Sequence, residues 1–196
     1  MMELEFVLAT ANAHKADEMR AVLAEVAVAV LARPPDVPDI DETCDTLEGN
    51  ALLKAHAICA ATGRPAIADD TGLFVDALGG APGVQSARYA GPAADDADNV
   101  RKLLSALSEV DGERRDAHFR TVIAVAYPDG TALTVEGVLD GWITDGPRGQ
   151  RGFGYDPVFA SAELGGRTLA EVSAEEKNAV SHRARALMAL AERLRR

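Results

Sequence analysis

The segment 66–73 (AIADDTGL) constrains the fold most strongly, because two adjacent aspartates directly follow a short apolar run. Residues 66–68 predict the end of a buried strand, and Gly72 predicts a turn just after Asp69 and Asp70. Carboxylates at a buried strand end are unfavourable unless a cation or hydrogen bonds meet them. The pair is therefore a candidate ligand set for a hard cation such as Mg2+. On these eight residues alone a solvated turn is the favoured interpretation, and the rest of the chain decides against it.

Composition limits the class of protein. A chain of 196 residues with 47% apolar residues fits one domain, possibly with two lobes. The net charge of -11 argues against a nucleic-acid binder, although a few local cations could hold a small anion. Cys44 and Cys59 lack metal-ligand spacing, which favours a reducing compartment without disulfides. With no signal-peptide pattern and no apolar run long enough to cross a bilayer, we expect a cytoplasmic protein that binds neither membranes nor nucleic acids.

A strand-to-helix turn near the start of the chain predicts an anion site. Residues 4–9 predict a strand, and apolar residues at helical spacing begin after residue 15. The backbone N–H groups and the dipole at such a helix start attract anions. Thr10, Asn12 and Lys15 add a hydroxyl, an amide and a cation, which together suit phosphate. The alternative is that Asn12 only caps the helix and Lys15 is solvated, and the glycine pattern of a P-loop is absent.

A second helix is predicted by its cap and its end. Asp45 with Glu48 predicts a capping box, and Gly63 predicts the end of the helix. Glu42 lies just before this helix and Lys54 lies within it. On pattern alone, both residues are typical of a protein surface.

A hairpin and a long loop follow. Residues 119–127 and 132–139 predict two strands joined by a Pro-Asp-Gly turn. The loop 147–157 mixes glycines and arginines with Phe153 and Tyr155. Glycines let a ligand approach the backbone, and aromatic faces stack on bases. A long loop whose aromatic residues pack into the core explains the same residues about as well.

The end of the chain predicts a helix with cations at its start. Residues 168–171 and 173–176 both have the pattern of a capping box. The helix that follows carries Lys177, His182 and Arg183 close to its start. Cations there oppose the helix dipole, so the cluster hints at an anionic or carbonyl-bearing ligand. Strands that alternate with helices early and pair as a hairpin late predict a mixed α/β sheet.

Together, these features describe a nucleotide site with a divalent metal. In the same order along nearly the whole chain, the sequence resembles the non-canonical purine nucleoside triphosphate pyrophosphatases, the inosine/xanthosine triphosphatase or HAM1-like family. The resemblance rests on segments 10–15 (TANAHK), 42–43 (ET), 50–55 (NALLKA), 68–73 (ADDTGL), 78–83 (LGGAPG), 86–89 (SARY), 152–157 (GFGYDP), 176–178 (EKN) and 181–183 (SHR).

The sequence departs from the family pattern at four positions. Cys44 and Gly49 replace the usual Gly and Glu, Thr71 replaces Ser, and Gln85 replaces a frequent Tyr. Thr71 keeps a hydroxyl for the substrate. Gly49 has no carboxylate, so no metal role is assigned to it.

The resemblance implies a fold and an activity. The fold is α/β, with a mixed, strongly twisted central sheet flanked by helices and two lobes with the active-site cleft between them. Residues 1–196 would form one nucleotide pyrophosphatase domain, working as a homodimer. The activity is Mg2+-dependent hydrolysis of ITP, dITP and XTP to the monophosphate and pyrophosphate.

The resemblance also implies the site residues. Glu42 and Asp70 would bind Mg2+, and Asp70 would be the general base oriented by Asp69, with the order of the two aspartates left open. Donors on His182 and Arg183 would pair with the C6 carbonyl of hypoxanthine or xanthine. The substrate-binding residues would be Thr10, Ala11, Asn12, Ala13, His14, Lys15, Lys54, Thr71, Phe153, Gly154, Tyr155, Asp156, Lys177, His182 and Arg183.

Two other functions compete with this one. The first is a Maf-like nucleotide pyrophosphatase with another base preference. The second is a nucleotide sensor that does not hydrolyse its ligand. The adjacent Asp69 and Asp70 speak against the sensor, because a pure binder gains little from two acids near phosphates.

Overall fold

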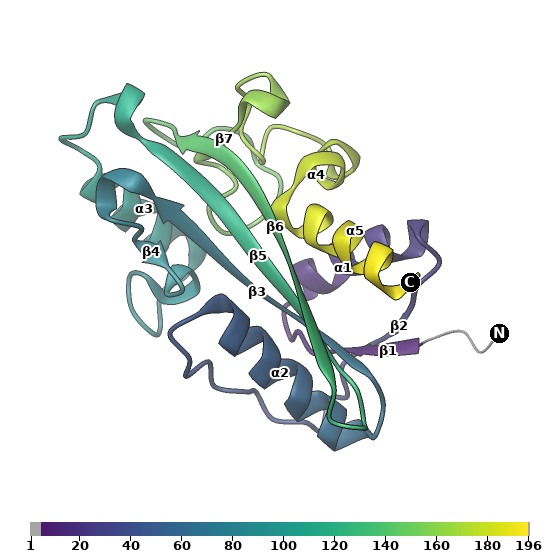
Figure 1. Ribbon diagram of the computed structural model, residues 1–196. Helices are drawn as coiled ribbons and strands as arrows, with labels where there is room; N and C mark the ends of the chain where they lie inside the picture. Colours follow the sequence, from purple (N-terminus) through teal and green to yellow (C-terminus); the bar gives the residue numbers. More distant parts are fainter. Residues whose placement is uncertain (1–4, 196) are drawn as a thin grey trace. The chain divides into compact units, whose positions relative to one another are not determined.

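The computed structural model describes residues 5–195, which form a seven-stranded sheet with helices (Figure 1). The chain forms two compact units. Of the described residues, the first comprises those up to Asp70, residues 121–137 and those from His182 onward. The second comprises residues 71–120 and 138–181.

The elements have the following bounds. The α-helices are α1 (Ala13–Glu25), α2 (Leu47–Thr62), α3 (Asp96–Ala106), α4 (Ala174–Val180) and α5 (His182–Leu194). The strands are β1 (Glu5–Leu8), β2 (Ala29–Leu31), β3 (Ala66–Val75), β4 (Pro82–Gly83), β5 (Asp116–Ala126), β6 (Ala132–Ile143) and β7 (Phe159–Ala160).

The sheet mixes parallel and antiparallel pairs. Its order is β2-β1-β3-β5-β6-β7, and β4 pairs with β3 beside this path. β1 runs parallel to both β2 and β3, whereas β4 is antiparallel to β3 and β7 is antiparallel to β6. The predicted mixed α/β sheet is therefore confirmed, as are the first strand and the hairpin of β5 and β6.

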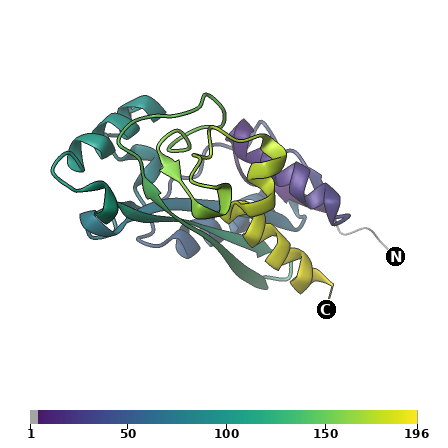
Figure 2. The same cartoon turned by 90° about the horizontal axis from the view of Figure 1, so that it is seen from above.

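The first unit buries its core between the sheet and two helices. α1 and α5 run side by side (Figures 1 and 2). Phe6 of β1, Met19 of α1, Ile123 of β5 and Leu187 of α5 are all fully buried in one cluster. Burying side chains of this size stabilises the unit by about 1.5–3 kcal/mol each. This core fixes the start of α1 and the start of α5 on the same strands.

The second unit has a core of its own. Leu103 of α3, Leu139 of β6 and Phe159 of β7 are fully buried in it. The rings of Phe119 and Phe159 lie 4.7 Å apart, at a tilt of 59°. The loop 147–157 is anchored to this core through Tyr155 and through Val158, the residue that follows the loop, and both are buried.

The prediction that a strand ends at the acid pair is wrong. β3 runs without interruption from Ala66 to Val75, so Asp69 and Asp70 lie inside it. Gly72 does not form a turn. Because it has no side chain, β4 can approach β3 closely at this position. A Cβ at this position would lie 2.6 Å from the carbonyl oxygen of Gly83 in β4.

The cap predicted for α2 is displaced by one residue. Thr46, not Asp45, is the N-cap, and its Oγ1 accepts a hydrogen bond from Gly49 N at 3.1 Å. Gly49 lies against Cys44, because a Cβ at position 49 would be 2.7 Å from Cys44 Cβ. The predicted end of α2 is confirmed: Gly63 follows the helix in the left-handed conformation.

The end of the chain forms two helices where one was predicted. Ser173 and Glu176 form the expected capping box at the start of α4. In the segment 168–171 only part of a box forms, and turns follow instead of a helix. Ser181 is extended, with φ -62° and ψ 152°, and it separates α4 from α5. Lys177 therefore lies in the last turn of α4, where a cation agrees with the dipole.

The start of α5 packs directly on β6 at Gly137. A Cβ at this position would lie 2.1 Å from the carbonyl oxygen of His182 and 2.4 Å from Ala186 N. Both of these are backbone atoms, so a side chain at position 137 would push α5 away from the sheet. Gly137 is therefore required for the close approach that places His182 and Arg183.

We predict that Gly137→Ala destabilises the protein by about 1–3 kcal/mol, the usual effect of overpacking. Gly146→Ala is the matched control, because a Cβ there meets no atom within 4 Å. Urea unfolding of both variants measures the difference. Equal stability of the two variants would contradict the close packing of α5 on β6.

Candidate active site

The acid pair lies just beyond the end of β1. β1 pairs with β3 at Val7↔Ala66 and Leu8↔Ile67 and ends there. Asp69 and Asp70 therefore follow the part of β3 that β1 covers. Successive side chains of a strand point to opposite faces, so the two carboxylates enter different surroundings.

Asp69 is held by two cations from the helices on its face. Its Oδ2 lies 3.1 Å from Lys15 Nζ of α1, and it accepts hydrogen bonds of 3.2 Å from Nε and Nη2 of Arg183 in α5. Arg183 Nη1 also donates to Glu18. Asp69 and Arg183 are both 2% exposed. Burial alone would raise the pKa of Asp69, but Lys15 and Arg183 hold it well below its usual value, so Asp69 is an anion at neutral pH.

Asp70 contacts a different group of residues, on α2. Lys54 Nζ donates to Asp70 Oδ1 at 2.9 Å and to Glu42 Oε1 at 2.6 Å. Asn50 Nδ2 donates to Asp70 Oδ2 at 3.3 Å, while Asn50 Oδ1 accepts from Cys44 N. Burial raises the pKa of Asp70 to about 6, and the charge of Glu42 adds to the rise while Lys54 opposes it. The two adjacent aspartates therefore differ in protonation behaviour.

These contacts change the interpretation of two predicted site residues. Glu42 and Lys54 have a surface pattern in the sequence, but the structure brings both to Asp70, with side chains 23% and 12% exposed. Asn50 is fully buried and was not predicted as a site residue. Its spacing of four residues from Lys54, one helical turn, is the signal that could have identified it.

The predicted strand-to-helix turn is present. Asn12 is the N-cap of α1, with Oδ1 accepting from Lys15 N at 3.2 Å, and Thr10 Oγ1 accepts from Asn12 N. Ala11, Ala13 and His14 are exposed around it. Lys15 is not simply solvated, because its ammonium is paired with Asp69. Asn12 thus caps the helix at a turn whose lysine reaches the acid pair.

The loop 147–157 divides its aromatic residues between two environments. Tyr155 is buried, and its hydroxyl donates to the carbonyl oxygen of Ser86 at 2.8 Å. Phe153 is half-buried, with Lys177 Nζ 4.8 Å from its ring centroid. The interpretation that the aromatic residues pack into the core is confirmed for Tyr155. Phe153 stays partly accessible, so its stacking on a base remains a prediction.

Asp156 organises the tip of this loop. Its Oδ2 accepts from Phe153 N at 3.0 Å and from Lys177 Nζ at 2.5 Å. Gly154 N donates to Asp96 at the start of α3. The predicted residues Phe153, Gly154, Asp156 and Lys177 therefore form one cluster in the second unit. Thr71 is half-buried and belongs to the same unit, whereas His182, which is buried, belongs to the first.

The residues around Asp70 suit a magnesium ion. Within residues 5–195 there is no cluster of three or more His, Cys, Asp or Glu side chains able to hold a metal. Glu42 and Asp70 nevertheless share one cation, the ammonium of Lys54, so their oxygens converge on a single point. Mg2+ is usually bound by one or two carboxylates together with substrate phosphates, and this pair supplies that number.

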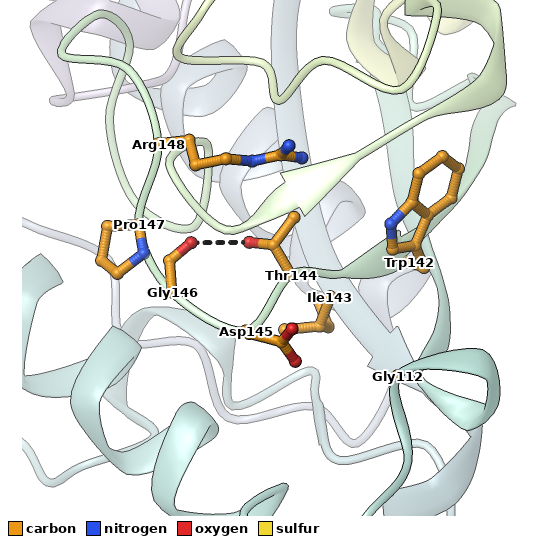
Figure 3. Close-up of a pocket in the computed structure, with 8 residues that line it drawn as sticks. All are labelled: Gly112, Trp142, Ile143, Thr144, Asp145, Gly146, Pro147 and Arg148. Atoms are coloured by element: carbon orange, nitrogen blue, oxygen red, sulfur yellow. Dashed lines mark hydrogen bonds between the residues drawn. The ribbon is translucent and has the colours of Figure 1, made fainter.

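A separate pocket lies in the second unit (Figure 3). It has a volume of about 470 Å3 and is lined by Gly112 and residues 142–148. The indole of Trp142 and the guanidinium of Arg148 border the same space. The pocket shares no residue with the predicted nucleotide site.

Among the described residues, no helix is both long and apolar enough to cross a membrane.

The mixed sheet and the acid pair define the class: an α/β protein with a buried acid–cation cluster beyond the carboxyl end of a parallel strand. The family model described as the Ham1 family matches residues 6–193. The chain therefore belongs to the Ham1 family, as the sequence motifs predicted.

Relatives and solved structures agree with this assignment. The chain is 50% identical to a dITP/XTP pyrophosphatase of Symbiobacterium thermophilum, over 99% of this chain and 96% of that one. It is 52% identical to a dITP/XTP pyrophosphatase of Geobacillus kaustophilus, over 96% and 93% of the two chains. The structure of a HAM1 protein from Coxiella burnetii superposes with a TM-score of 0.88, at 44% identity over 98% of each chain.

We predict that Asp69→Asn destabilises the protein by about 3–5 kcal/mol, because it leaves Lys15 and Arg183 without their buried anion. Asp17→Asn is the control: Asp17 pairs with Arg20, but its side chain is 76% exposed, so we expect a loss of about 0–1 kcal/mol. Denaturant unfolding at pH 7 compares the two. Similar losses for both variants would show that Asp69 contributes no more than a surface pair.

The raised pKa of Asp70 predicts a pH dependence of stability with a definite sign. An unfolded aspartate titrates near 3.8, whereas folded Asp70 titrates near 6. Between these values the folded protein binds the additional proton, so Asp70 makes the free energy of unfolding fall as pH rises from about 4 to about 6. Asp70→Asn removes this effect. Its stability relative to wild type should therefore be greater at pH 7 than at pH 4.5, and an unchanged difference would contradict the raised pKa.

Proposed function

We propose that this protein hydrolyses non-canonical purine nucleoside triphosphates, namely ITP, dITP and XTP, to the monophosphate and pyrophosphate, and so removes them from the nucleotide pool. The names of its relatives support this, because identity near 50% extends over almost the whole of both chains. The structural observation that supports it most is the acid pair. One aspartate is fixed as an anion, and the other shares a cation with Glu42.

The proposed metal is Mg2+, held by Glu42 and Asp70. When bound, it would neutralise phosphate charge and lower the pKa of the attacking water. The convergence of the two carboxylates on Lys54 supports this assignment. The side chains of the protein would carry out the proton transfer and bind the substrate.

The proposed general base is Asp70. It would take the proton of a water whose oxygen attacks the α-phosphorus, and the anhydride bond between the α- and β-phosphates would break. The pyrophosphate group leaves with the bonding electrons. Asp69 would hold Lys15 and Arg183 in place rather than take the proton, because its lowered pKa makes it a poor base at neutral pH.

The proposed triphosphate contacts are the turn at residues 10–15 together with Lys54. The backbone N–H groups at the start of α1 supply donors, and two lysines supply positive charge. In the second unit, Phe153 would stack on the purine, with Gly154, Tyr155, Asp156 and Lys177 shaping its surroundings, and Thr71 would contact the substrate. The accessible ring of Phe153 supports this role.

The proposed selectivity rests on the group at C6 of the purine. Hypoxanthine and xanthine carry a carbonyl there, whereas adenine carries an amino donor. Donors on His182 and Arg183 would match the carbonyl, and an unmatched pair of buried donors would disfavour adenine. Asp69 and Glu18 also accept hydrogen bonds from Arg183 and fix the orientation of its guanidinium. We also propose that residues 1–196 act as one domain, as a homodimer in the cytoplasm.

A panel of nucleoside triphosphates assayed for pyrophosphate release, with and without Mg2+, tests the proposal. We expect turnover of ITP, dITP and XTP that requires the metal and exceeds the turnover of ATP. Asp70→Asn should lower the rate by about 10²–10⁴-fold while nucleotide binding remains. Asp17→Asn should keep full activity.

Other outcomes would favour the competing functions. Preferred turnover of a nucleoside triphosphate with another base would indicate a Maf-like specificity. Binding of ITP by the wild type without any pyrophosphate release would indicate a sensor. Asp70→Asn with wild-type turnover would remove Asp70 from the reaction.

A further inference from the structure

The ammonium of Lys54 lies between the carboxylates of Glu42 and Asp70. Lys54 Nζ is 2.6 Å from Glu42 Oε1 and 2.9 Å from Asp70 Oδ1, and all three side chains are largely buried. We propose that this ammonium occupies, in the nucleotide-free protein, the place that the divalent metal takes, and that it moves to the triphosphate when metal and nucleotide bind. The inference rests on the proposed function for the metal site, but not on hydrolysis.

The ammonium and the metal exclude each other because they need the same oxygens. A magnesium ion lies about 2.0–2.1 Å from its oxygen ligands and requires near-octahedral geometry around it. An ion held by Glu42 and Asp70 would use the oxygens that Lys54 Nζ contacts and would therefore lie close to that ammonium. Two cations at such a distance in a mostly buried site repel each other strongly. The metal can enter only if the ammonium leaves.

Lys54 can move away from the two carboxylates, and Asn50 keeps the Asp70 carboxylate oriented when Lys54 moves. A lysine carries a compact charge on a flexible four-carbon chain, so the ammonium can swing while α2 stays fixed. Asn50 lies one turn earlier on α2. Its Nδ2 donates to Asp70 Oδ2, whereas Lys54 donates to Asp70 Oδ1. The other end of its amide is fixed by Cys44 N. Asn50 thus keeps the carboxylate of Asp70 oriented without the help of Lys54.

The exchange makes metal binding depend on the nucleotide. Without nucleotide, the metal must displace an ammonium from two anions, which weakens its affinity. With nucleotide, the displaced ammonium gains the triphosphate as a new anionic partner. Each ligand therefore strengthens the binding of the other by the same factor, and Lys54 is the residue that couples them.

The first test measures Mn2+ binding by electron paramagnetic resonance on the full chain without nucleotide. We expect Lys54→Gln to bind Mn2+ about 10-fold or more tightly than the wild type, because the competing cation is gone. Lys102→Gln is the matched control: it removes one lysine charge from an exposed position in the second unit. Its Mn2+ affinity should equal that of the wild type. Equal or weaker binding by Lys54→Gln would overturn the inference.

The second test repeats the measurement with an ITP analogue that carries a methylene group between the α- and β-phosphorus atoms. The analogue should tighten Mn2+ binding to the wild type by a larger factor than to Lys54→Gln, after correction for Mn2+ bound by the free analogue. An equal factor in both proteins would overturn the coupling role. If the wild type binds no Mn2+ even with the analogue, the metal site of the proposed function fails as well.

Thermal unfolding guards against a variant that folds poorly. Lys54→Gln and Lys54→Met leave Glu42 and Asp70 without their cation, so both should unfold at a lower temperature than the wild type. Mn2+ should raise their unfolding temperatures by more than it raises that of the wild type. Variants that Mn2+ does not rescue would show that Lys54 is a fixed structural partner, and this outcome overturns the exchange.

Discussion

The ion pairs of Asp69 hold the first unit together around its site. One buried carboxylate on β3 bonds Lys15 at the start of α1 and Arg183 at the start of α5, two helices far apart in sequence. A buried charge is tolerated only when it is paired and hydrogen-bonded in this way. The arrangement orients a helix start that suits phosphate and an arginine that begins the last helix. Asp69 thus stays charged and paired in the interior, beside a second aspartate with different partners.

The neighbouring aspartates illustrate how a strand makes two different acids from identical residues. Alternation along β3 sends Asp69 toward two cations and Asp70 toward Glu42, Lys54 and Asn50. The pKa of the first is held low, and the pKa of the second is raised to about 6. A pair of titratable groups with separated pKa values allows one to remain charged while the other exchanges a proton. In this chain, the two pKa values differ because the two side chains point to opposite faces of the sheet and meet different charged residues there.

The sequence predicts what depends on neighbours along the chain. Asn12 and Ser173 cap their helices by accepting from an N–H three residues ahead, which a local pattern can show. Glu42 and Lys54 look like surface residues because Lys54 joins Glu42 to Asp70 on β3, a contact that no local pattern shows. The break at Ser181 was missed for a similar reason: no proline or glycine marks it, and the place of α5 is fixed by its packing on β6. The family resemblance supplied candidate site residues that periodicity could not, but it did not reveal which face each aspartate takes.

The contact between Cys44 and Gly49 makes these two positions depend on each other. The family resemblance leads us to expect glycine and glutamate there, where this chain has cysteine and glycine. The side chain of Cys44 fills the volume that a Cβ at position 49 would need. The two positions are therefore sterically coupled. A side chain at position 49 has room only if the residue at position 44 is smaller than cysteine or shifts away, so the two positions have to be changed together.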